Sequence, residues 1–218
     1  MIVALRNVHT RFALLTLTAV LVASNLRAAQ DKPDEKVVVS GAPSPTPQTA
    51  SEPDSTTDGS VTVSGQAIEY RAVAGTLTVG ATDAEDATLG FDGKLLPDSG
   101  VKPAGTPAEA PATARMFYAG YFKKGTVPES RPITFIYNGG PGSATMWLHL
   151  GSFGPRRVVV PDTEHQEGAP YTLINNQYSL LDVSDLVFID APGTGLSRTF
   201  GKDKAKAFYG VDGDGHAF

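Results

Sequence analysis

The chain has 218 residues, of which 41% are hydrophobic and 19% charged, and its formal net charge is -5 at pH 7. This composition is ordinary for a soluble protein and leaves room for one domain, and the mild acidity argues against nucleic acid as a partner. The absence of cysteine excludes disulfides, thiolate metal sites and a cysteine nucleophile. The four histidines show no metal-ligand spacing, and there is no P-loop or dinucleotide fingerprint, so the sequence implies no cofactor.

Residues 1–29 are typical of a secretory signal peptide. Three side chains make up the basic n-region: Arg6, His9 and Arg11. The apolar run Phe12–Ala23 that follows is too short for a membrane-spanning helix, which needs about 20 residues. We therefore expect cleavage after Ala28 or Ala29, no stable membrane anchor, and export to the periplasm or the extracellular space. An uncleaved signal anchor is the alternative.

Residues 30–58 have the composition of a linker. They hold five prolines among Ser, Thr, Asp and Gln, and Val37–Val39 is almost their only apolar stretch. A segment with so little to bury is expected to be disordered.

The first predicted strands are Val61–Val63 and Ile68–Val73, which are rich in β-branched residues and are separated by a short turn. Residues 80–113 are rich in Asp, Gly, Ala and Pro and are expected to form a long loop. Arg115–Lys124 returns to strand composition, with Gly120 as a candidate bulge. We expect these antiparallel strands at the outer edge of a sheet.

A strand followed by a glycine loop stands at the centre of the sequence. The run Ile133–Tyr137 has the composition of a buried strand. It is followed by Asn138 and then by the sequence Gly-Gly-Pro-Gly. Such a loop exposes backbone N–H groups at the edge where open α/β sheets place their ligands, and these groups can stabilise a negative oxygen. A tight turn without chemistry is the alternative.

Three further elements follow. Ser143 is expected to cap a helix that runs through Leu150 and ends at Gly151. Met146, Trp147 and Leu150 should form its buried stripe. Leu186–Asp190 is a second apolar strand, and Asp212–Gly215 lacks the ligands of a calcium loop and is expected to be a flexible turn.

Four motifs in this order resemble the serine carboxypeptidase family, whose members are secreted peptidases with the α/β-hydrolase fold. The motifs are Asn138–Gly142, Gly154-Pro155, Asn176–Ser179 and Asp190–Ser197. The resemblance covers Ala114–Phe218, about half of the chain. It implies an α/β fold over residues 59–218, an incomplete α/β-hydrolase with the N-terminal part of the central sheet and edge antiparallel strands. It also implies removal of C-terminal residues from peptide or protein substrates through an acyl-enzyme.

The same resemblance implies roles for three residues. The Gly140 amide matches an oxyanion donor, and Asn138 and the Gly139 amide match positions that bind the carboxylate at the end of the substrate. Two positions depart from the family pattern: Ser152 stands where many members have a glutamate, and Leu180 stands where a tryptophan is usual.

The sequence contains no G-x-S-x-G motif for a nucleophile. Ser197 comes nearest, and Ser143 with His149 and Asp190 is an alternative triad that we regard as a poor candidate. In the family the nucleophile, acid and histidine all come after the matching segment, so we expect this chain alone to be inactive. There are two alternative hypotheses. The chain could be part of a different α/β-hydrolase, such as an aminopeptidase or esterase, or it could be a non-catalytic secreted binding module. Asn138 favours the carboxypeptidase, because proline iminopeptidases have histidine there.

Without later strands to cover it, Leu186–Ile189 is expected to expose an apolar edge and to promote aggregation.

Overall fold

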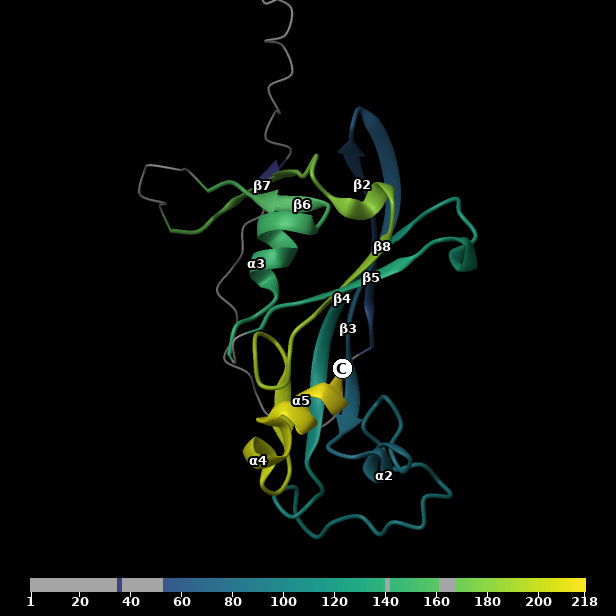
Figure 1. The fold of residues 1–218 in the computed structure, drawn as a ribbon, viewed down its shortest axis with the longest axis vertical. Coiled ribbons are helices and arrows are strands. Elements are labelled where there is room, and N and C mark those ends of the chain that lie inside the picture. The colour runs from purple at the N-terminus through teal and green to yellow at the C-terminus, as the bar shows by residue number, and fades with distance from the viewer. Residues whose placement is uncertain (1–34, 37–52, 140–141, 161–167) are drawn as a thin grey trace, which may run out of the picture. The chain divides into compact units, whose positions relative to one another are not determined.

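The structure is a computed structural model that describes residues 35–36, 53–139, 142–160 and 168–218 (Figure 1). Contacts divide the chain into two units, Met1–Pro33 and Asp34–Phe218, and every described residue lies in the second unit. The predicted signal peptide, most of the predicted linker and Gly140 lie outside the described residues.

A six-stranded sheet forms the centre of the described unit (Figure 1), and β8 pairs with β4 on one side and with β5 on the other. The strands follow the order β2-β3-β4-β8-β5, and β9 pairs with one end of β4. Their bounds are β2 Ser55–Val63, β3 Gln66–Gly80, β4 Thr113–Lys123, β5 Ile133–Tyr137, β8 Asp185–Ile189 and β9 Arg198–Phe200. All pairs are antiparallel except β5 with β8, which run parallel. The predicted α/β class is confirmed, with a mainly antiparallel sheet and few helices.

A smaller sheet has the order β1-β7-β6. Its strands are β1 Glu35–Lys36, β7 Thr172–Asn175 and β6 Arg156–Val158. The side chain of Asn175 joins this sheet to β2, because its amide donates to the Thr62 carbonyl at 2.9 Å and its oxygen accepts from the Thr62 amide at 2.7 Å.

The helices are short. They are α2 Asp83–Asp86, α3 Met146–Leu148, α4 Lys204–Phe208 and α5 Val211–Ala217, with 3-10 turns η1 Pro128–Ser130 and η3 Leu180–Asp182 and a π-helix η2 His149–Phe153. Over the described residues, none has the length and apolar character needed to cross a membrane.

Both faces of the main sheet carry apolar side chains, because successive residues of a strand point to opposite faces. The first face buries Ile136 of β5 beside Phe188 of β8 and packs against Leu181 of η3. The second face buries Met116 of β4 against Phe208 of α4. At the β5 end this second face is only partly covered. The Phe218 ring lies against Tyr137, with 4.5 Å between the centroids, and three side chains are at least half exposed: Ile133, Phe135 and Tyr137.

The predicted hairpin is confirmed, and β3 is longer than expected. The bulge predicted at Gly120 is wrong, because the β3–β4 register continues without interruption from Tyr70–Lys123 to Gly80–Thr113. A Cβ at Gly120 would lie 2.7 Å from the ring of Phe122, so the glycine makes room for that ring.

Two strands overlap the stretch 30–58 that composition assigned to a linker. One is β1, and the other is the start of β2 at Ser55. The first residues of β2 are polar and largely exposed, and they are held by backbone pairing to β3, from Ser55–Ala74 onward. Backbone pairing of this kind requires no apolar side chains, which is why composition did not reveal it.

The helix predicted after the glycine loop exists, but its details differ. It begins at Met146 after Thr145, and Gly151 lies within the π-helix that extends it to Phe153. Ser143 does not cap it, and the predicted buried stripe is wrong because Met146 and Trp147 are exposed. Leu148 packs against the core instead.

Two other expectations are wrong. Asp212–Gly215 is not a turn but part of α5, where Gly213 approaches the carbonyl of Ala207 too closely for a Cβ. Leu186–Ile189 is not an edge, because β4 and β5 pair with its two sides. The strands at the two ends of the described order are β2 and β5.

Candidate functional site

Two glycine-containing loops leave the main sheet at neighbouring points. Strands β5 and β8 are parallel and in register, with Tyr137 beside Ile189. Asn138 and Asp190 therefore follow at the same edge, which is the position where ligands bind in open α/β sheets.

Asn138 shapes the first loop. Its side-chain amide donates to Ser143 Oγ at 2.7 Å and to the Ala144 carbonyl at 3.3 Å. Its side-chain oxygen accepts from the Gly139 amide at 3.0 Å. The two described residues predicted to bind the substrate carboxylate thus lie together, and Gly139 is exposed. Gly140 lies outside the described residues.

Thr145 fixes the end of this loop to β8. Its hydroxyl donates to the Ile189 carbonyl and accepts from the Asn138 amide at 3.2 Å, and its own amide donates to Asp190 Oδ1 at 2.8 Å. Sequence reasoning did not single out this residue. The only local signal is a hydroxyl residue directly before the helix, a position where capping residues occur.

Ser197 is a structural residue of the second loop. Its hydroxyl is fully buried, donates to the Asp190 carbonyl at 2.7 Å and accepts from the Phe117 amide at 2.8 Å. A hydroxyl with these two backbone partners ties the loop to β4 and is not placed to attack a substrate.

His149 packs in an aromatic cluster. Its Nε2 lies 2.6 Å from the Tyr121 hydroxyl, and its ring stacks on Phe188 with the centroids 4.5 Å apart. Burial lowers the pKa of His149 to about 4, although the charge of Asp190 acts in the opposite direction. Because Ser143 bonds Asn138 and His149 bonds Tyr121, the alternative triad of Ser143, His149 and Asp190 is not assembled in this structure.

Two of the sequence motifs form one unit beside the π-helix. Asn176 is fully buried, and its amide donates to the carbonyls of Ser152 at 2.6 Å and Gly154 at 2.7 Å. Ser179 donates to the Phe153 carbonyl at 3.0 Å. The Asn-x-Tyr-Ser motif therefore holds the Gly-Pro turn, and Ser152, at the glutamate position, contributes its backbone oxygen to this contact.

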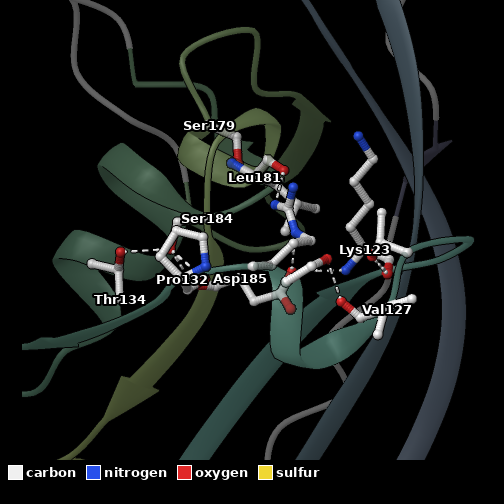
Figure 2. Close-up of polar contacts among 11 residues, drawn as sticks. Lys123, Val127, Pro132, Thr134, Ser179, Leu181, Ser184 and Asp185 are labelled. Atoms are coloured by element: carbon white, nitrogen blue, oxygen red, sulfur yellow. Dashed lines mark hydrogen bonds and ion pairs between the residues drawn. The ribbon is translucent and has the colours of Figure 1, made fainter.

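A buried ion pair anchors the start of β5, and Figure 2 shows the polar contacts around Asp185. Arg131 Nε lies 3.0 Å from Asp185 Oδ1, and the Arg131 guanidinium also donates to the Leu181 carbonyl at 2.9 Å. The same carboxylate oxygen accepts from the Lys123 amide at 3.0 Å. This network joins β4, β5, β8 and η3, and sequence reasoning missed it.

Other groups of the molecule do not add to this site. A cavity of about 920 Å³ is lined by residues of α2, α4 and α5, among them Asp83, Lys206 and His216, none of which the sequence pointed to. Within the described ranges no group of His, Asp and Glu side chains is arranged to hold a metal ion.

Comparison with known proteins gives a family match for part of the chain. No solved structure matches the chain. The family model described as serine carboxypeptidase matches residues 106–211, a range that contains both glycine loops and the Gly-Pro and Asn-x-Tyr-Ser motifs. Residues 106–211 therefore match the serine carboxypeptidase family.

Proposed function

We propose that this chain supplies the oxyanion-donating and carboxylate-binding part of a serine-type carboxypeptidase, which removes C-terminal residues through an acyl-enzyme. The observation that carries the proposal is the Asn-Gly-Gly-Pro-Gly loop at the carboxyl end of β5, beside the end of β8 and inside the family match.

The loop offers two kinds of donor. The backbone amide of Gly140 is assigned to the oxyanion of the tetrahedral intermediate, on the sequence motif alone. Asn138 and the Gly139 amide are assigned to the substrate carboxylate. The Gly139 amide is bonded to Asn138 Oδ1 at 3.0 Å, so the substrate has to replace that contact. A carboxylate can do so, because charge-assisted hydrogen bonds are roughly twice as strong as neutral ones.

The proposal includes no acyl transfer by this chain alone. Acyl transfer needs a nucleophile and a base that share a hydrogen bond. Ser143 and Ser197 are engaged by Asn138 and by backbone groups, and His149 is engaged by Tyr121. A fluorophosphonate probe should therefore leave the chain unlabelled, and stoichiometric labelling at Ser143 or Ser197 would contradict this account.

A binding experiment tests the carboxylate site directly. We expect a dipeptide with a free C-terminus to shift the backbone NMR signals of Asn138 and Gly139, and the same dipeptide with an amidated C-terminus to shift them little. Acetylating the N-terminus should change nothing, because a free N-terminus is the requirement of an aminopeptidase. Equal shifts by the acid and the amide would reject carboxylate recognition.

A non-catalytic secreted binding module is the second candidate, and it accounts for the lack of a G-x-S-x-G motif in this sequence as well as a peptidase whose motif lies further downstream. Reading the genomic DNA past the Phe218 codon in all frames separates the two. A downstream G-x-S-x-G followed by Asp and His supports the peptidase, and their absence supports the binding module.

A further inference from the structure

We propose that Asp190 is a positioning residue whose carboxylate clamps the two glycine loops together and thereby orients Asn138. The inference rests on the proposed function only for the consequence that it assigns to Asn138. The clamp itself is argued from the contacts of Asp190.

The two carboxylate oxygens of Asp190 hold two different loops. Oδ1 accepts from the Thr145 amide at 2.8 Å, at the end of the loop that follows β5. Oδ2 accepts from the Leu196 amide at 2.9 Å, in the loop that follows β8. One side chain therefore joins segments that lie about 50 residues apart in the sequence, and each loop depends on a different oxygen.

The second loop is shaped around this carboxylate. Gly195 has φ +47, and a Cβ at this residue would lie 2.0 Å from Asp190 Oδ2. Any other residue at this position would meet the clamp itself. The glycine is thus required by the close approach of the carboxylate and by the backbone conformation together.

The carboxylate is not placed there by an ion pair. Asp190 is 7% exposed, and among the described residues its carboxylate accepts hydrogen bonds from two backbone amides, those of Thr145 and Leu196. Burying a charge is costly unless hydrogen bonds compensate it, so the two amides stabilise the charge while it fixes them. Asparagine cannot replace it, because its NH2 group would face one of the two N–H donors.

Thr145 connects the Asp190 carboxylate to Asn138 in the candidate substrate site. The Thr145 hydroxyl accepts from the Asn138 amide at 3.2 Å, while the Thr145 amide is held by Asp190. A shift of the Asp190 carboxylate therefore moves Thr145, and Thr145 moves Asn138 and the start of the glycine loop.

Substitution of Gly195 tests this coupling without touching the first loop. In Gly195→Ala the new methyl group displaces the carboxylate, so hydrogen exchange of the Thr145 amide should accelerate by about tenfold or more, the effect of losing a hydrogen bond to a charged group. Gly125→Ala is the matched control: Gly125 also has a left-handed φ, +74, but a Cβ there would meet nothing within 4 Å. This control should leave Thr145 exchange unchanged.

A second variant and a site-specific readout separate positioning from general stability. Asp190→Asn should accelerate exchange at Thr145 or Leu196, and both variants should shift the side-chain NH2 signals of Asn138 while Gly125→Ala does not. Unchanged Thr145 exchange and unchanged Asn138 signals in Gly195→Ala would overturn the clamp. If the clamp responds as expected but free-acid peptides do not bind even to the unsubstituted chain, the clamp stands and the proposed function fails.

Discussion

The imidazole of His149 and the hydroxyl of Tyr121 share a hydrogen bond, with 2.6 Å between Nε2 and the phenolic oxygen. The Tyr121 ring in turn meets Phe188 edge to face at 6.0 Å between centroids. This cluster fastens the π-helix behind the glycine loop to β4 and β8. Its histidine is neutral in the folded protein near pH 7, because burial lowers the pKa of His149 to about 4.

The depressed pKa of His149 predicts a pH-dependent stability. The unfolded chain protonates this residue near its ordinary pKa of 6.5, whereas the folded protein does so only near about 4. The folded state therefore binds fewer protons between these values, and its stability is full above the upper pKa and falls as the pH drops towards the lower one. The loss should be roughly 3 kcal/mol across that window.

Urea denaturation of the chain and of His149→Phe at about pH 7 and about pH 5 checks this prediction. Carboxylates titrate in both proteins, so their contribution cancels in the difference between them. The free energy of unfolding of the unsubstituted chain should fall more steeply with acid than that of the variant. Parallel pH dependences would show that His149 does not titrate on unfolding.

The Arg131–Asp185 pair predicts a large loss of stability when one partner is removed. The two side chains are 10% and 6% exposed, so Arg131→Met leaves a buried carboxylate without its cation. Breaking such a pair typically costs about 3–5 kcal/mol. Lys94→Met is the control, because Lys94 pairs with Asp92 at 2.9 Å on the surface and its loss should not be measurable.

A double variant distinguishes the buried charge from lost packing. Arg131→Met with Asp185→Leu removes both charges and should recover part of the stability lost in Arg131→Met. If the double variant is less stable than the single one, the hydrogen bond that Asp185 accepts from the Lys123 amide matters more than the buried charge.

The strands and the glycine loop could be predicted because their signals are local. Ile133–Tyr137 and Leu186–Asp190 are short apolar runs. The structure has β5 and β8 at these positions, and the bounds of each strand differ from the predicted ones by at most one residue. The motif Asn138–Gly142 likewise follows directly from the order of residues. Composition alone did not predict where β2 begins. The strand starts within the predicted linker because its polar residues pair with β3 through the backbone.

The sequence could not reveal contacts that depend on strand order. The edge was assigned to Leu186–Ile189 because nothing local shows that β8 inserts between β4 and β5. For the same reason the roles of Thr145 and Asp190 in the site were missed. They meet only because the parallel pairing of β5 with β8 brings the two loops to one end of the sheet.

Asn138 is predicted to act on the substrate carboxylate as well as on the loop, and two variants separate these effects. Ser143→Ala removes the loop hydrogen bond of 2.7 Å but leaves the Asn138 amide, whereas Asn138→Ala removes both. Asn138→Ala should weaken binding of free-acid peptides much more than Ser143→Ala does, and it should affect amidated peptides less. Equal losses in the two variants would limit Asn138 to a structural role.

Gly140 is predicted to matter for turnover in an enzyme that carries the triad. A bulky residue there should misplace the backbone donor, and loss of one oxyanion donor typically costs about 2.7–4 kcal/mol of transition-state stabilisation. The kcat for an amidated or ester substrate measures this loss, because such a substrate has no free carboxylate to engage Asn138 and Gly139. An unchanged kcat would remove Gly140 from the oxyanion hole.

Export is predicted from the N-terminal apolar run. In a Gram-negative host the chain should accumulate in the periplasm, shortened by about 28 residues. Intact mass of the periplasmic protein measures the cleavage site, and Leu15→Arg, which interrupts the apolar run, should keep the chain in the cytoplasm at full length. Full-length protein in the membrane fraction would instead indicate an uncleaved anchor.

Among the described strands, β5 lies at one end of the main sheet, and this position predicts that the purified chain aggregates. The Asp185 amide donates to the Pro132 carbonyl, so in the parallel pair the backbone groups of Pro132, Thr134 and Ile136 face β8 and those of the alternate residues face outward. Those alternate residues are also the exposed apolar ones, and the strand carries no charged residue. An edge with free backbone groups and apolar side chains is a template for pairing with another chain.

A charge in the middle of this edge should suppress that pairing. Phe135 is 61% exposed, so Phe135→Lys removes little packing and places a cation in the strand, and light scattering at increasing concentration should show less aggregation. Val211→Lys is the control, because Val211 is 91% exposed but lies in α5, away from any strand edge. If the two variants reduce aggregation equally, net charge rather than the β5 edge governs it, and if neither does, the chain associates through another surface.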